Sequence, residues 1–119
     1  MKENILIIAL HPNHMGITEN GLISANRYIL SKDKNFKFQR LVIFAREDWQ
    51  TPGGIKEAKL RAMQDRFIFP GEEGTTLDVL YGATVEIVYG DFEKNRAKLI
   101  ESVESKMIEF IGGCVFLHL

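Results

Sequence analysis

Four short segments rich in apolar residues alternate along the chain with longer segments in which apolar and polar residues mix. The short segments cover residues 5–10, 38–45, 84–89 and 114–119. Near-continuous apolar segments of this kind are typical of strands that are buried on both faces of a sheet. We therefore predict four strands. The first holds six consecutive apolar residues, and we expect it to lie inside the sheet.

The segments between these strands show the spacing of amphipathic helices. Apolar residues recur every three to four positions in residues 18–30, 55–67 and 91–111, with polar residues between them. Thr18 and Asp91 stand where the first and third helices begin, so we expect both to be N-caps. The third helix is expected to have one apolar face, formed by Phe92, Leu99, Ile100, Val103, Met107, Ile108 and Ile111.

The order of these elements predicts the fold class. Strands and helices alternate without a tight hairpin signal, which implies parallel strands with helices on both faces of the sheet. We predict an α/β fold, a small three-layer Rossmann-like domain with a mostly parallel sheet of four to five strands. Residues 75–81 fit a short helix or an extension of this sheet. Residues 1–119 are expected to form this single domain, as a minimal version or as a fragment of a longer protein.

Composition narrows the classes of partner. Fifteen basic and sixteen acidic residues give a formal charge of −1, so we expect no extended nucleic-acid surface and predict that any nucleotide is bound at a local site. The apolar segments are far shorter than the roughly 20 residues that cross a bilayer, which predicts no membrane partner. Cys114 is the single cysteine, and we expect it to be a small buried core residue of a cytoplasmic protein.

The fold class also predicts where a ligand binds. In an open parallel sheet, ligands bind beyond the carboxyl ends of the strands. The ends of the first three strands are followed by residues 11–16, 46–49 and 90–91, and His118 lies at the end of the fourth strand. We therefore expect a site at this edge with the following candidate binding residues: His11, Asn13, His14, Ile17, Thr18, Glu19, Arg46, Trp49 and His118.

Two imidazoles three positions apart leave two interpretations open. His11 and His14 fit a metal site, because imidazole is a common metal ligand and a turn can aim both rings inward. His118 or Asp48 would then complete the ligand set. The alternative is that both histidines are polar turn residues, one of them hydrogen-bonded to the backbone.

The other candidates point to an anion or to ordinary loop structure. The start of the first helix fits a phosphate or carboxylate that is bound by free N–H groups, or a simple cap by Thr18. Arg46 fits a phosphate contact and Trp49 fits stacking on a base. Equally, these two residues fit a solvated loop with the indole folded over the sheet.

Residues 5–22 read ILIIALHPNHMGITENGL, a strand followed by a small loop, an Ile-Thr-Glu step and a helix. This pattern resembles the opening of CRISPR-associated Rossmann-fold (CARF) domains, with Leu10, Ile17, Thr18 and Glu19 at matching positions. An acidic turn at the end of the third strand, a long helix and a fourth strand continue the similarity. The resemblance implies a homodimer that binds cyclic oligoadenylate with the loops after its first and fourth strands.

Residues 11–14, which read HPNH, are also similar to the His-Pro-Asp-Asp opening of LmbE-like zinc deacetylases. Glu57 stands roughly where those enzymes carry a glutamate. This second resemblance implies a zinc cofactor, with His11 and His14 as ligands, and deacetylase or hydrolase activity. Asn13 replaces the aspartate that serves as the base, which favours an inactive relative.

These observations lead to three functions of different classes. The one we favour is a binding module that senses a nucleotide-like anionic ligand of cyclic oligoadenylate type at the carboxyl edge of the sheet, as a homodimer and without a cofactor. The second is an LmbE-like metal-dependent hydrolase. The third is an interaction domain without a small ligand.

Overall fold

Strands and helices alternate in the structure, a computed structural model that describes residues 2–10, 15–68 and 78–118. The strands are β1 (Asn4–Ala9), β2 (Arg40–Arg46), β3 (Thr84–Gly90) and β4 (Cys114–His118). The helices are α1 (Met15–Lys32), α2 (Ile55–Ile68) and α3 (Arg96–Glu109), with short 3-10 helices η1 (Glu47–Gln50) and η2 (Asp78–Leu80). Across these ranges, no helix is both long and apolar enough to cross a membrane.

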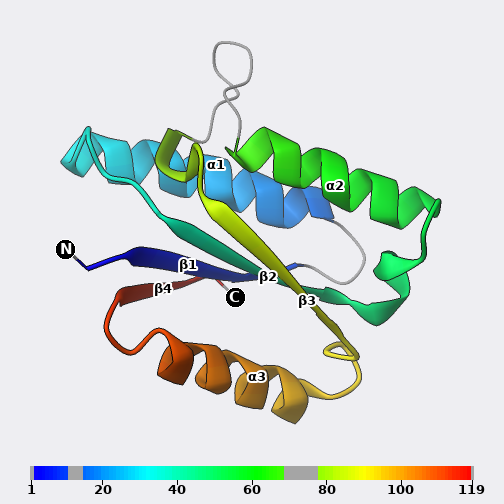
Figure 1. Cartoon of the computed structure of the whole chain (residues 1–119). Coiled ribbons are helices and arrows are strands. Elements are labelled where there is room, and N and C mark those ends of the chain that lie inside the picture. The colour runs from blue at the N-terminus through cyan, green and yellow to red at the C-terminus, as the bar shows by residue number, and fades with distance from the viewer. Residues whose placement is uncertain (1, 11–14, 69–77, 119) are drawn as a thin grey trace.

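The four strands form one parallel sheet in the order β3-β2-β1-β4. Helices α1 and α2 cover one face of this sheet and α3 covers the other (Figure 1). The predicted three-layer, Rossmann-like α/β fold is therefore confirmed, and β1 lies inside the sheet as expected. Residues 78–80 form a 3-10 helix rather than a strand, whereas residues 75–77 lie outside the described ranges.

Alternate side chains of β1 enter two separate cores. Leu6 and Ile8 pack with Leu41 and Phe67 on the face covered by α1 and α2. Ile5 and Ile7 pack on the other face with a smaller cluster that includes Val103 of α3. Because both faces of β1 are buried, its sequence is apolar at every position from 5 to 8.

Two of the predicted helix starts are wrong. Helix α1 begins at Met15, so Thr18 lies within the helix and is not its N-cap. Helix α3 begins at Arg96, where Asn95 caps it by accepting the Lys98 N–H at 3.1 Å. The Asp91 carbonyl instead accepts the Asn95 N–H at 3.2 Å. Asp91 therefore opens a turn that delays the start of α3.

The predicted apolar face of α3 is only partly buried. Leu99 and Val103 pack against the sheet, but exposed fractions are 58% for Ile100, 70% for Ile108 and 83% for Ile111. Cys114 is also exposed, so its predicted burial is wrong. Ile108 is five positions from Val103 and therefore lies on the far side of α3, away from the sheet. Cys114 lies on β4, an edge strand beyond which there is no described element.

Candidate functional site

The sheet grows first on one side of β1 and then on the other. Strands β2 and β3 extend the sheet on one side of β1, and the chain then crosses over to place β4 on the other side. This is the order of the first four strands in Rossmann folds, where ligands bind beside such a reversal at the carboxyl ends of the strands. A pocket of about 710 Å³ lies there, between α3 and the sheet.

The walls of this pocket combine apolar surface with charged groups. The apolar wall comes from the strand ends and from α3: Leu10, Phe44, Phe92, Leu99, Ile100, Val103, Met107 and Leu117. The polar groups are Thr18, Arg46, Glu93, Arg96, Glu104 and His118. Binding sites for small molecules commonly have this composition, in which apolar walls surround a few orienting polar groups. We call this hollow the carboxyl-edge pocket.

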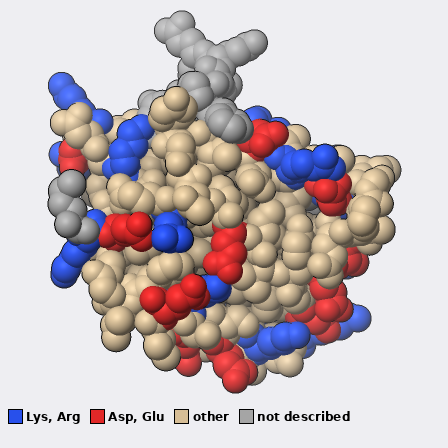
Figure 2. Space-filling model, in the orientation of Figure 1, with Lys and Arg blue, Asp and Glu red and all other residues tan. Residues whose placement is uncertain are grey.

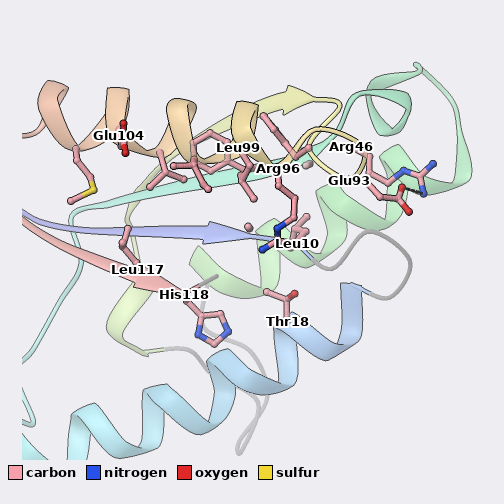
Figure 3. Close-up of a pocket in the computed structure, with 16 residues that line it drawn as sticks. Leu10, Thr18, Arg46, Glu93, Arg96, Leu99, Glu104, Leu117 and His118 are labelled. Carbon is pink, nitrogen blue, oxygen red and sulfur yellow. Dashed lines mark ion pairs between the residues drawn. The ribbon is translucent and has the colours of Figure 1, made fainter.

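Arg46, a predicted site residue, lines the pocket but is held by carboxylates. Its Nε and Nη2 atoms donate to the two carboxylate oxygens of Asp48 at 3.1 and 3.0 Å. Its Nη1 atom lies 3.4 Å from Glu93 Oε2, the ion pair marked in Figure 3. Two negative charges therefore already compensate this guanidinium, and an incoming phosphate would have to compete with them.

Arg96 is a pocket residue that sequence reasoning missed. Its side chain extends from the start of α3 toward the carboxyl end of β1, beside Leu10 (Figure 3). It makes no ion pair with any residue of the described ranges. Recognising Asn95 as the helix cap would have placed Arg96 in the first turn of α3, at the ligand edge of the sheet.

Thr18 and His118, two further predicted residues, meet at the pocket. Thr18 is buried, and the His118 ring points from β4 toward α1 (Figure 3). A Cβ atom on Gly21 would lie only 3.0 Å from His118 Nε2. Glycine at this position of α1 therefore gives the imidazole its space.

The carboxylate of Glu19 is engaged away from the pocket. Arg66 of α2 donates to its two oxygens, from Nε at 2.8 Å and from Nη2 at 3.2 Å. The hydrogen bond to Glu19 raises the pKa of Arg66 above its ordinary value. Glu19 therefore joins two helices, an interaction that local sequence could not reveal because the partner lies 47 residues away.

Trp49 lies in the core rather than in the carboxyl-edge pocket. Trp49 is only 2% exposed and packs with the hydrophobic cluster under α1 and α2. Lys56 Nζ lies 5.6 Å from the centroid of its ring. Of the two interpretations left open by the sequence, this position agrees with the indole folded over the sheet.

Three predicted residues, His11, Asn13 and His14, lie outside the described ranges, and for Ile17 only the helical backbone is described. Within the described ranges, no three His, Cys, Asp or Glu residues are grouped closely enough to hold a metal ion. Because the two imidazoles of the predicted zinc site are not among these residues, metal binding by His11 and His14 stays a prediction.

Comparison with known proteins adds no relative: no family model, curated protein or solved structure matches this chain. Both family resemblances therefore stay predictions.

Proposed function

We propose that this chain is a binding module for a nucleotide-like anionic ligand of cyclic oligoadenylate type. The observation that carries this proposal is the carboxyl-edge pocket, which lies where the strand order reverses and into which Arg96 extends. A pocket of about 710 Å³ falls within the usual size of small-molecule sites.

The two kinds of pocket wall suit the two parts of such a ligand. Arg96 would hold a phosphate by charge-assisted hydrogen bonds, close to Thr18 in the first turns of α1. The apolar side chains of α3 and Leu117 would cover a base or ribose. Because α1 begins at Met15, its free N–H groups lie no later than Ile17, so Thr18 would contribute its side chain.

A local site also agrees with the distribution of charge. Lys and Arg residues are interspersed with Asp and Glu residues over the face shown in Figure 2. An extended basic surface would attract nucleic acid along its length, whereas an arginine in a pocket, such as Arg96, suits a small anion. We further propose that the module is cytoplasmic, as we expect from its single cysteine, and that it is a homodimer, as the CARF resemblance implies.

Calorimetric titration with cyclic tetra-adenylate and with adenosine 5′-monophosphate tests the proposal. We expect saturable heat with at least one of these nucleotides. The affinity should fall as the salt concentration rises, because the contact with Arg96 is ionic. Arg96→Gln should lower the affinity about tenfold, the effect of losing one charge-assisted hydrogen bond. Lys98→Gln, the same loss of charge two positions away on α3, should leave the affinity unchanged.

Other results would favour the other functions. Absence of heat with both nucleotides on a folded sample would contradict the proposal and favour an interaction domain. Absence of nucleotide heat together with stoichiometric zinc that survives dialysis would favour the metal-dependent hydrolase.

A further inference from the structure

The outer edge of β4 is a second feature of this side of the molecule, and Leu117 of this strand also borders the carboxyl-edge pocket. We propose that β4 pairs antiparallel with β4 of a second copy of this chain, so that two four-stranded sheets become one. This inference deepens the proposed homodimer by naming its interface, and it does not depend on which ligand binds.

The two edges of the sheet differ in how they are protected. Strand β3 carries Glu86, whose carboxylate accepts hydrogen bonds from Lys106 Nζ at 2.8 and 2.7 Å. Strand β4, Cys114–His118, contains no acidic residue, lysine, arginine or proline. Natural edge strands commonly carry a charge or a proline that blocks pairing with another chain. The β4 edge lacks these devices within the described residues.

The backbone of β4 also offers hydrogen-bonding groups at this edge. The Cys114 N–H donates to the Glu3 carbonyl at 2.8 Å, so the backbone groups of Cys114 point toward β1. Backbone groups alternate along a strand, and those of Val115 and Leu117 therefore face away from β1. Strand β1 is the only described strand beside β4, and these outward N–H and C=O groups are open to a new strand.

Apolar side chains are exposed on both faces of β4. Phe116 is 41% exposed on the α1 face, where its ring centroid lies 5.7 Å from that of Phe36 and 5.3 Å from that of Phe38. Leu117 is 47% exposed on the α3 face. It borders the carboxyl-edge pocket and, with Phe116, a second and mostly apolar hollow of about 160 Å³. A strand added at this edge would cover both faces.

A pairing centred on Phe116 is self-complementary. Val115 would then face Leu117 of the partner subunit, and their outward backbone groups would form the pairs of hydrogen bonds of an antiparallel ladder. Phe116 would face Phe116 of the partner subunit and extend the aromatic cluster across the two-fold axis. Each of these contacts joins apolar residues, and none places like charges opposite one another. This self-complementarity favours a second copy over an unrelated chain.

The available area fits a dimer of moderate strength. The exposed parts of Phe116, Leu117, Ile100 and Met107 amount to apolar area on the order of 400 Å² per copy. A standard stable interface buries about 800 Å² per partner, so these side chains supply about half of that area. We therefore expect a dimer whose population depends on protein concentration.

Light scattering coupled to size exclusion, without any nucleotide, tests the interface. We expect the mass to rise with concentration toward twice the 13.6 kDa of one chain. Phe116→Lys places a charge on the β4 edge and should give a monomer. Thr84→Lys introduces the same charge on β3, the other edge strand, and should keep the dimer. A wild-type monomer at every concentration would overturn the inference, as would a Phe116→Lys dimer of unchanged strength.

A cross-linking measurement decides the case if Phe116→Lys does not fold. In the Cys114→Ser background, Phe116→Cys places two thiols at a non-hydrogen-bonded pair about 4.5 Å apart between Cα atoms, within reach of a disulfide. Mild oxidation should give a covalent dimer, and Thr84→Cys in the same background should not. Equal cross-linking by the two variants, or none by Phe116→Cys, would contradict the pairing. Nucleotide titration of the same samples separates this result from the fate of the ligand proposal.

Discussion

At the scale of single residues, two arginines of the carboxyl edge differ in their electrostatic surroundings. The Arg46 guanidinium lies between the carboxylates of Asp48 and Glu93, whereas Arg96 has no carboxylate partner in the described part of the chain. A compensated guanidinium attracts an anion less than an uncompensated one. The sequence identified Arg46 from its position after a strand, but it could not show which arginine had already found its counterions.

A glycine at the start of β4 provides a test of packing at the same scale. A Cβ atom on Gly113 would lie 2.6 Å from Ile5 Cδ1 and 2.9 Å from the Glu3 carbonyl oxygen. Because that oxygen belongs to the backbone beside β1, it cannot move away easily. We expect Gly113→Ala to lower the free energy of unfolding by about 1–3 kcal/mol, measured by urea denaturation.

The neighbouring glycine is the matched control. A Cβ atom on Gly112 would meet no described atom within 4 Å. Gly112→Ala should therefore change the free energy of unfolding by less than about 0.5 kcal/mol. Equal losses in the two variants would show that the close approach of Gly113 to β1 does not constrain the fold.

At the scale of elements, strands were more predictable than helix ends. Burial on both faces makes residues 5–8 and 41–45 continuously apolar, and this pattern needs no knowledge of tertiary contacts. The start of α3 was missed because Asp91 and Asn95 are both competent caps, and the turn between them decides which one is used. Cys114 was misplaced because the chain's own pattern does not reveal which strand is at the edge.

The contact between α1 and α2 gives a prediction at this scale. Glu19→Gln removes the charge that Arg66 pairs with. Since the Arg66 and Glu19 side chains are 54% and 21% exposed, water screens the pair, and we expect a loss of unfolding free energy of about 0.5–1 kcal/mol. A double-mutant cycle with Arg66→Gln should return a coupling energy of similar size.

Glu101, an exposed residue of α3, provides the control for the loss of stability expected in Glu19→Gln. Glu101→Gln removes a carboxylate that has no ion pair within the described residues and should leave stability within about 0.5 kcal/mol. Nucleotide affinity should be the same in Glu19→Gln and in the wild type. Weaker nucleotide binding with unchanged stability would instead mean that Glu19 contacts the ligand, as its predicted position at the ligand edge of the sheet suggests.

At the scale of the whole molecule, the strand order explains why two features lie on one side. The reversal between β1 and β4 places the carboxyl-edge pocket beside the open edge of the sheet. Alternating strands and helices predicted a parallel sheet and therefore its ligand edge. They could not predict the order of the strands, because a crossover can return to either side of the first strand. The pocket's position therefore required the structure.

A two-dimensional ¹H–¹⁵N NMR titration of the folded protein with cyclic tetra-adenylate tests most directly whether a nucleotide binds in the carboxyl-edge pocket. If the ligand binds in the carboxyl-edge pocket, saturable shifts should be concentrated at the amides of Leu10, Thr18, Arg96 and His118. The signal of the Gln39 amide, which lies before β2 at the amino ends of the strands, should not shift. Shifts concentrated at the amino ends of the strands, or an unchanged spectrum in excess nucleotide, would contradict binding in this pocket.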